Sequence, residues 1–272
     1  MEKRLILFKF VTLLIVSSVF GANDNFPIGA RQAAMSNASV CLSDVWSVHH
    51  NQAGLAYLKN ISLGFNTENK YLNKNLAIHS FVLALPVNMG VFGFNLSYFG
   101  FDKYNESKIA ISYAKSFGDK FSAGIQFDYL NTYIDDNFGN QGTAVIEAGI
   151  IAKPIENLTI GAHIYNPTHA QISKSTDEKV PTIFKIGLAY KFYENTIICI
   201  ENEKDIDFDP IYKIGIEYHI VKNVLLRTGL STNPGRFSFG VGYIFRKFSA
   251  DIAFSRHEIF GMTPDFSIDY TF

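Results

Sequence analysis

The stretch "RFSFGVGYIFRKFSADIAFS", residues 236–255, alternates between apolar and polar side chains over almost its whole length. One set of alternate positions holds only apolar side chains, namely Phe237, Phe239, Val241, Tyr243, Phe245, Phe248, Ala250, Ile252 and Phe254. Successive side chains of a β-strand point to opposite faces of its sheet. The stretch therefore predicts two antiparallel strands, each with one apolar face, joined by a tight turn at Arg246 and Lys247.

The same alternation recurs from residue 60 to the end of the chain. "FKIGLAYKF" (184–192) and "YKIGIEYHI" (212–220), for example, keep Lys, Gly or Glu between their apolar positions. The pattern predicts fourteen strands, at about residues 60–67, 75–85, 88–99, 107–117, 120–132, 143–153, 157–165, 182–192, 196–205, 211–220, 223–231, 236–245, 247–256 and 264–272.

The composition indicates where the apolar faces point. Only 18% of the 272 residues are charged and 15% are aromatic, whereas soluble domains carry about a quarter charged residues. A soluble β-sandwich also has one apolar face per strand. However, aromatic residues at the ends of the apolar faces, with glycines and full charges opposite, favour a membrane barrel with a polar interior. The balance of 24 basic and 25 acidic residues provides no basic surface for nucleic acid.

The connections between the predicted strands alternate in length. "PVN", "GD", "PIEN", "YEN", "VKN" and "RK" are short, whereas "NTENKYLNK", "FGFDKYNE", "DDNFGNQ", "NPTHAQISKSTDEKVP", "DIDFDP", "STNPGR" and "HEIFGMTP" are longer. Short turns at one end, longer loops at the other and an even number of strands are typical of bacterial outer-membrane barrels. We therefore expect an all-β fold: a membrane-spanning antiparallel up-and-down barrel of about 14 strands, over residues 60–272. Both chain ends are expected at the short-turn, periplasmic side.

The first 22 residues have the character of a secretory signal peptide. Lys3, Arg4 and Lys9 precede an apolar stretch over residues 10–20, which is followed by Gly21 and Ala22. The stretch is too short for a membrane-spanning helix, which needs about 20 apolar residues. With the barrel pattern, it predicts the outer membrane of a Gram-negative bacterium. The two cysteines, Cys41 and Cys199, show no paired spacing, so whether they form a disulfide stays open.

The chain ends on an amphipathic strand, "DFSIDYTF" at 265–272, with Phe266, Ile268, Tyr270 and Phe272 on its apolar face. In a closed barrel the last strand pairs with the first, so this strand is structural. A terminal phenylalanine on such a strand also resembles the signal by which the outer-membrane assembly machinery recognises its clients. We therefore expect that machinery to be a partner.

Residues 23–59 do not alternate, and they resemble the N-terminal segment of the FadL-like outer-membrane barrels, most closely in the PorV/PorQ branch. The matching residues are Gly29, Ala30, Arg31, Met35, Ala38, Val40, Asp44, Asn51, Ala53, Gly54, Leu55 and Ala56. The chain departs from the family at Gln52, where proline is usual, and at Ser36 and Asn37, where glycine is common. The resemblance implies that residues 23–59 form a hatch that fills the barrel lumen.

Physical considerations are consistent with a hatch. Arg31 would be costly to bury unless it is paired, and Asp44 is an available partner. A barrel of fourteen strands leaves an open pore unless something fills it. The alternative, a periplasmic leader outside the barrel, stays open at this point.

Charged residues recur on the faces that the alternation turns inward. They are Lys108, Asp128, Glu147, Lys153, Lys185, Lys191, Lys213, Glu217, Arg227, Arg236, Arg246 and Asp251. We interpret them chiefly as a mixed-sign network that compensates buried charges. A weak preference for anions in the lumen is the functional alternative.

Catalytic and metal chemistry have little support. His163 and His219 are predicted to face the lumen, and His49 and His50 lie in the hatch segment, but no spacing typical of a metal site occurs. Near the predicted extracellular rim are Asp135, Asp136 and His257, which the sequence does not order into a triad. We expect no enzyme, no metal and no cofactor.

The resemblance implies two functions. The favoured one is a non-enzymatic interaction protein linked to type IX-like secretion, as in the PorV/PorQ branch, with residues 166–181 as the exposed contact. The alternative is FadL-like passive transport of small hydrophobic molecules, with a kink at Gly90 and Gly93 that would let a ligand leave sideways. The expected partners are therefore outer-membrane lipid and either a secretion component or a hydrophobic small molecule.

Overall fold

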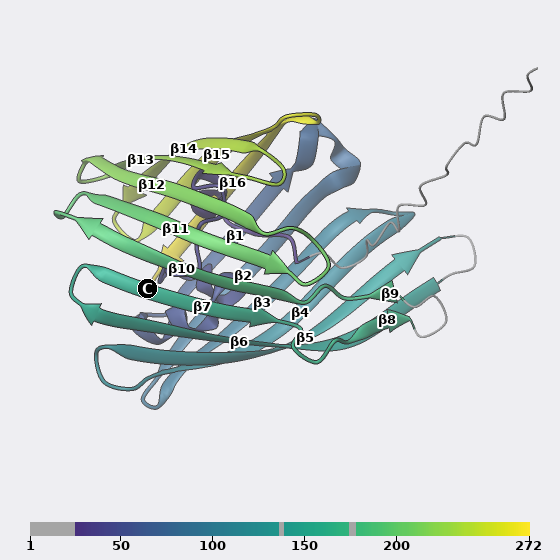
Figure 1. The fold of residues 1–272 in the computed structure, drawn as a ribbon, viewed down its shortest axis with the longest axis horizontal. Coiled ribbons are helices and arrows are strands. Elements are labelled where there is room, and N and C mark those ends of the chain that lie inside the picture. The colour runs from purple at the N-terminus through teal and green to yellow at the C-terminus, as the bar shows by residue number, and fades with distance from the viewer. Residues whose placement is uncertain (1–24, 136–138, 174–177) are drawn as a thin grey trace, which may run out of the picture.

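In the computed structural model, which describes residues 25–135, 139–173 and 178–272, fourteen strands form one closed antiparallel barrel (Figure 1). The strands of the wall are β1 (Ser62–Asn69), β2 (Ala77–Val87), β3 (Gly90–Phe101), β4 (Tyr104–Ser116), β5 (Phe121–Ile134), β6 (Gly139–Ile155), β7 (Leu158–Tyr165), β10 (Ile183–Phe192), β11 (Thr196–Asp205), β12 (Ile211–Val221), β13 (Val224–Ser231), β14 (Arg236–Phe245), β15 (Phe248–His257) and β16 (Gly261–Thr271). The predicted fold class and strand number are confirmed.

The last strand closes the barrel on the first. β16 pairs with β1, with Ser62 opposite Thr271, and the Phe272 N–H donates to the Ile61 carbonyl at 2.9 Å. Closure leaves no unpaired sheet edge, which a barrel in lipid requires because lipid offers the backbone no hydrogen bonds.

Several strands extend further than the alternation predicts. β3 and β4 are joined by two residues, with Phe99 opposite Glu106, although "FGFDKYNE" was expected to be a loop. β15 likewise continues to His257, and β16 already begins at Gly261. This expectation was wrong because polar residues can continue a ladder beyond the apolar part of the wall. The longer connections that remain are residues 70–76, 166–182, 206–210 and 232–235.

Short elements decorate the barrel. The 3₁₀ turns η2 (Lys70–Leu72) and η3 (Lys74–Leu76) link β1 to β2, and the hairpin β8 (Gln171–Ser173) and β9 (Glu178–Lys179) lies between β7 and β10. No helix among the described residues is long and apolar enough to cross a membrane.

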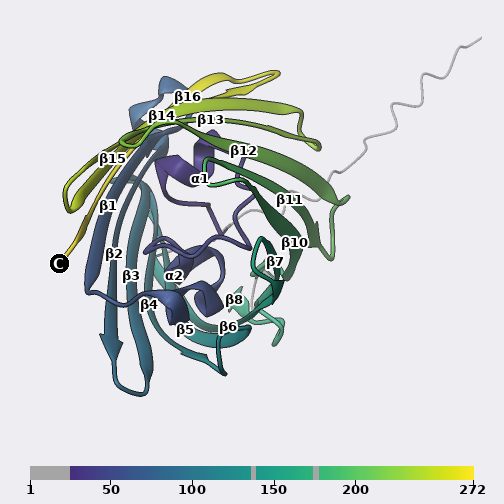
Figure 2. The ribbon, with the colours of Figure 1, turned by 90° about the vertical axis from the view of Figure 1, so that its left-hand side faces the viewer.

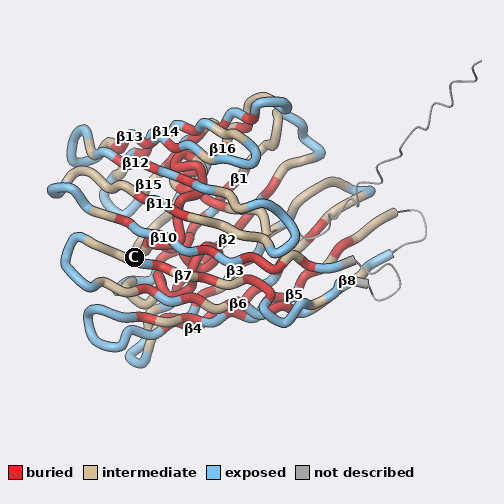
Figure 3. The backbone as a smooth tube through the Cα atoms, viewed as in Figure 1, coloured by how far each residue is buried: buried red, intermediate tan, exposed pale blue. Residues whose placement is uncertain are grey.

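Residues 25–58, here called the luminal segment, lie inside the barrel (Figure 2). They contain α1 (Ala30–Ala34), α2 (Ser47–His50) and the 3₁₀ helix η1 (Gln52–Tyr57). Most of the segment is buried (Figure 3). Asn25 lines a cavity with Phe208 and Asn233 at the long-loop end, so residue 25 is not at the short-turn end where both chain ends were expected. The segment crosses the lumen before β1 begins.

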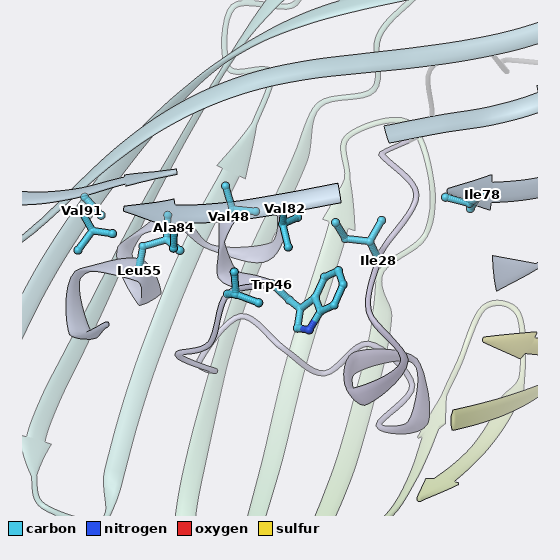
Figure 4. Close-up of a cluster of buried hydrophobic side chains, with 10 residues drawn as sticks. Ile28, Trp46, Val48, Leu55, Ile78, Val82, Ala84 and Val91 are labelled. Atoms are coloured by element: carbon cyan, nitrogen blue, oxygen red, sulfur yellow. The ribbon is translucent and has the colours of Figure 1, made fainter. Parts of the chain in front are cut away.

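The main apolar core lies between the luminal segment and the wall. Trp46, Ile28 and Leu55 of the segment pack with Val82 and Val91 of the wall, together with Val48, Ile78, Ala84 and Ala114 (Figure 4). The core therefore fixes the segment to the β2–β4 side of the barrel.

Candidate functional site

Nine wall strands place a glycine against the luminal segment: Gly64, Gly93, Gly124, Gly149, Gly161, Gly187, Gly215, Gly229 and Gly240. At Gly161 a Cβ atom would lie 2.5 Å from the Val40 carbonyl oxygen, closer than real Cβ atoms approach. Glycine is the residue that permits such a close approach between two backbones. These nine glycines therefore leave the space that the luminal segment occupies. These inward glycines are visible in the sequence, but only Gly93 among them was assigned a role, as part of a kink.

An arginine of α1 forms the first of three polar anchors. The Arg31 guanidinium donates twice to the Glu217 carboxylate, at 2.8 Å each, and once to Asp44 at 2.9 Å. The expected Arg31–Asp44 pair is thus present. Arg227 donates to the same Glu217 at 2.6 Å and to Asp251 at 2.5 Å, so the cluster joins α1 to β12, β13 and β15. Such bidentate, charge-assisted bonds are among the strongest in proteins.

The second anchor uses the backbone of the segment. The Ser39 and Val40 N–H groups both donate to one oxygen of Glu201, at 2.8 Å each. The other Glu201 oxygen accepts from Lys213 at 2.9 Å, and Lys213 also contacts Glu203 at 2.7 Å. The predicted set of inward charges lacked the acids Glu201 and Glu203, although they follow Cys199 at alternate positions. Their charges offset the basic excess on which an anion preference would depend.

The third anchor centres on Glu147, which is fully buried. Its carboxylate accepts from Gln52 of η1 at 2.7 Å and from Lys108 at 2.5 Å. His163 and Gln126 of the wall also contact it, at 2.9 and 3.1 Å. A buried carboxylate is stable only when its oxygens are compensated in this way.

Two buried histidines of α2 are neutral. The Nε2–H of His50 donates to the Ile28 carbonyl at 2.7 Å, so its Nδ1 accepts from Ser39 at 3.0 Å. Burial, together with the positive Lys185, lowers the pKa of His50 to about 3. Burial also lowers the pKa of His49 well below its usual value.

Cavities lie on both sides of the luminal segment. The cavity at the long-loop end has a volume of about 560 Å³ and is lined by charged groups including Lys70, Asp205 and Arg236. The cavity at the short-turn end, of about 510 Å³, includes Lys191, Arg246 and Asp269. The segment therefore separates two polar vestibules.

A third, smaller cavity lies between the segment and the wall. Its volume is about 40 Å³, and aromatic and aliphatic side chains form most of its lining: Phe26, Ile78, Tyr98, Phe99, Leu130 and Tyr165. It is the place where apolar side chains of the segment and of the wall enclose free space together.

Solved structures share this barrel with its internal segment. A CymD monoaromatic hydrocarbon channel matches with a TM-score of 0.70 at 12% identity, over 92% of this chain and 99% of that chain. This is the FadL-like barrel fold. The toluene transporter TbuX of Ralstonia pickettii also gives 0.70 at 12% identity, over 90% and 98% of the two chains. A Pseudomonas aeruginosa FadL homologue gives 0.66 at 12% identity, over 91% and 98%.

The FadL-like likeness concerns the fold, because all these identities are low. No family model and no curated protein matches the chain. The PorV/PorQ branch therefore stays a prediction from residues 23–59. Those motif residues lie inside the lumen: Gly29 directly precedes α1, Met35 packs on Gly215, and Gly54 lies against Leu42.

The wall of this FadL-like barrel is unbroken at the strand where a kink was expected. β3 pairs with β2 and β4 without a register shift, so the expectation for Gly90 and Gly93 was wrong. The space over Gly93 is occupied by Val48 and Leu55. This glycine admits the luminal segment, and β3 stays paired on both sides there.

The longest loop packs over the lumen at the long-loop end. Ile172 and Val180 are buried with Leu130 and Tyr165 of the wall. The Asn166 side chain fixes the loop by donating to the Val180 carbonyl at 2.8 Å and accepting from the Ala170 N–H. Ile172 and Val180 turn inward, whereas Pro167, Thr168, His169, Gln171 and Lys179 are exposed, so the use of residues 166–181 as a contact stays a prediction; residues 174–177 lie outside the described residues.

The remaining predicted residues occupy separate places. Lys185 contacts Glu203 at 3.4 Å, whereas Arg236 lines the long-loop cavity and Arg246 lies in a turn. Lys153 lies over the Tyr57 ring at 3.3 Å. No described group of three or more His, Cys, Asp or Glu side chains is arranged to hold a metal.

The rim and terminal residues also have defined places. His257 accepts from the Ile259 and Phe260 N–H groups and so shapes a turn, while Asp136 lies outside the described residues. Tyr270 packs against Phe248 and Phe272 at the short-turn end, with ring centroids 4.5 and 4.8 Å away. The use of Phe266, Ile268, Tyr270 and Phe272 as an assembly signal stays a prediction. Cys41 and Cys199 are free, buried thiols in one apolar cluster.

Proposed function

We propose that this chain is a non-enzymatic outer-membrane channel that transports small hydrophobic molecules passively. In this proposal residues 1–22 are a signal peptide, residues 23–59 a hatch and residues 60–272 the barrel. The names of the structural neighbours, a hydrocarbon channel and a toluene transporter, support transport over the secretion role that the sequence motif favoured.

The aromatic-lined cavity is the observation that carries the proposal. Ligand sites for small apolar molecules are concave, mostly apolar and few per protein. This cavity combines Phe26 of the segment with Phe99 and Tyr165 of the wall, beside the polar vestibule at the long-loop end. A hydrophobic molecule would leave water there and enter the barrel.

Passage then requires the luminal segment to move, because the fourteen strands form a closed wall. The α1 half is the part whose displacement would join the two vestibules. The Ser36 hydroxyl, just after α1, lies 3.0 Å from the Ser238 hydroxyl of β14. Cysteines at these two positions are therefore within reach of a disulfide.

The test is a reversible lock. The double variant Ser36→Cys/Ser238→Cys, made in a chain with Cys41→Ala and Cys199→Ala, is oxidised in intact cells, and the uptake of labelled toluene and of labelled phenol is measured. Intact cells are used because the outer membrane must be the barrier that limits uptake. We expect the oxidised lock to stop the uptake that the wild-type barrel supports, and a reductant to restore it.

The single variant Ser36→Cys is the matched control, since it cannot form the lock. Equal uptake with and without the lock, or no uptake with the wild-type barrel, would contradict the transport function.

A second function, the PorV/PorQ-type accessory role in type IX-like secretion, is supported by the motif residues of the luminal segment. Arg31, Asn51 and Leu55 all serve to hold the segment in place, which suits a barrel that stays plugged while it binds a partner. Its test is cross-linking in the native host followed by purification. Recovery of a secretion component with the barrel would favour this role, and recovery of a bound hydrophobic molecule would favour transport.

A further inference from the structure

We infer that Phe26 occupies the ligand's own place, and that the ligand is a single aromatic ring that carries an oxygen substituent, as in phenols. This inference rests on the proposed transport function and names its substrate class. It is carried by the size of the cavity, the surroundings of the Phe26 ring and two unpaired hydrogen-bond donors.

The cavity is too small for an aromatic ligand while Phe26 is in place. Its volume is about 40 Å³, whereas a buried cavity that binds benzene measures about 150 Å³. Phe26 forms part of the lining and comes from the luminal segment, so displacement of its ring enlarges this same cavity. The ligand and the Phe26 ring therefore exclude each other.

The surroundings of Phe26 select an aromatic ring. The Phe99 ring lies 4.7 Å from it at an angle of 53°, and the Lys70 ammonium group lies 3.2 Å from its centroid. Tilted ring pairs and cations over a ring face both favour aromatic over aliphatic groups. A ligand ring that replaces Phe26 inherits both contacts.

Two buried donors at the cavity select an oxygen. The amide of Asn95 donates to His49 Nδ1 at 3.3 Å, which leaves the His49 Nε2–H as a donor. Neither His49 Nε2 nor Asn25 Nδ2 has a hydrogen-bond partner among the described residues, and both side chains line the cavity. His49 is only 2% exposed. An unpaired buried donor is costly, and an oxygen acceptor on the ligand removes that cost.

The lining also limits the charge of the ligand. Lys108 and Glu106 line the same cavity, and Lys108 donates to Glu147 at 2.5 Å and lies 3.1 Å from Asp128. Lys108 is neutralised in this way and Lys70 lies over the ring face, so a neutral phenol is favoured over a benzoate anion, whose carboxylate would be desolvated beside Glu106.

The experiment measures binding of two fluorinated probes, 4-fluorophenol and fluorobenzene, to the full detergent-solubilised chain by ¹⁹F NMR line broadening. We expect Phe26→Ala to bind 4-fluorophenol about tenfold more tightly than the wild type does, because the competing ring is gone. Phe92→Ala, which removes an outward-facing ring of β3, is the matched control and should change nothing.

The second comparison tests the oxygen. In the Phe26→Ala background, His49→Leu should weaken 4-fluorophenol binding about tenfold and leave fluorobenzene binding unchanged, since only the phenol uses the lost donor. Equal affinity of wild type and Phe26→Ala for both probes would overturn the assignment of Phe26. A His49→Leu effect of equal size on both probes would overturn the preference for oxygen.

These outcomes are distinguishable from failure of the transport function. If the probes bind in the expected pattern but the barrel supports no uptake, the proposed binding site is supported and the transport function is contradicted. If the Ser36–Ser238 lock stops uptake but Phe26→Ala does not change binding, the transport function is supported and the proposed binding site is contradicted.

Discussion

The two halves of the luminal segment are held in different ways. The half around α1 contacts β13–β16, and its strongest contacts are the ion pairs of Arg31 with Glu217 and Asp44. The half around α2 and η1 contacts β2–β6, and its centre is the apolar cluster of Trp46 and Leu55. Salt screens the partly exposed Arg31–Asp44 pair more than the buried contacts of the cluster, and it does not screen apolar packing. One short segment therefore joins a half held mainly by charge interactions to a half held mainly by apolar packing, in which the buried Gln52–Glu147 contact is the polar anchor.

Two proteases report the two halves separately. Trypsin cleaves after Arg31 and so detects release of the α1 half, whereas chymotrypsin cleaves after Tyr57 of η1 and detects release of the other half. When a segment opens and closes quickly, cleavage rates follow the population of its open state.

The largest expected effect is that of Trp46→Ala. Trp46 is fully buried among Ile28, Val48 and Val82, so its truncation should cost about 3–5 kcal/mol of docking free energy. We expect fast chymotrypsin cleavage of the α2 half that is equally fast at low and high salt. A strong salt dependence would show that this half is not held by apolar packing.

Glu217→Gln comes next. The substitution keeps the shape of the side chain but removes the charge shared by Arg31 and Arg227, at a cost of about 3 kcal/mol. Trypsin cleavage after Arg31 should become fast, and the acceleration by salt that we expect for the wild type should disappear. Glu194→Gln is the control and should resemble the wild type. Glu194 lines the cavity at the short-turn end, as Glu217 does. Faster cleavage in the α2 half alone would contradict the division into two halves.

Acid should loosen the half that is held mainly by apolar packing. His50 has a pKa of about 3 when folded and about 6.5 when free, so its contribution is complete above pH 6.5 and is lost as the pH falls below that value. At about pH 4.5 the loss amounts to about 2–3 kcal/mol. Chymotrypsin cannot be used at that pH, so pepsin cleavage of residues 25–58 is the measurement. His50→Gln should make the pH dependence shallower, and an unchanged dependence would exclude His50 as its source.

The smallest effect on docking is expected from Phe272→Ser. Phe272 lies at the short-turn end, away from both halves, and one interfacial side chain contributes at most about 1.5–3 kcal/mol. The variant should reach the outer membrane in a lower amount, measured by fractionation, while both cleavage rates stay at their wild-type values. Normal assembly in cells would show that the terminal ring is not an assembly signal.

The barrel was predictable because its information is local. Alternation in stretches such as 236–255 specifies both the strand and its apolar face, so all fourteen strands were found. The ends were less predictable, since polar residues such as Glu106 occur both in loops and in paired strands.

The arrangement inside the lumen was predictable only in part. Arg31 and Asp44 are close in sequence, and their pairing followed from the cost of burying one charge. The partners Glu217, Glu201 and Glu147 come from distant strands; alternation placed Glu217 and Glu147 inward, missed Glu201, and did not show what any of them contacts. The inward glycines such as Gly161 indicated where another backbone lies against the wall. A series of positions without side chains allows such a close approach.

The buried thiols allow the opening of the lumen to be timed in the native chain. Cys41 belongs to the luminal segment and Cys199 to β11, and both are enclosed in the same cluster. Burial raises the pKa of Cys41, and an enclosed neutral thiol does not react with a water-soluble maleimide. Each alkylation therefore records one excursion of the segment, as amide exchange records local unfolding. The rate at which the two native thiols are alkylated thus measures how often the lumen opens, and mass spectrometry gives this rate after timed exposure to the reagent.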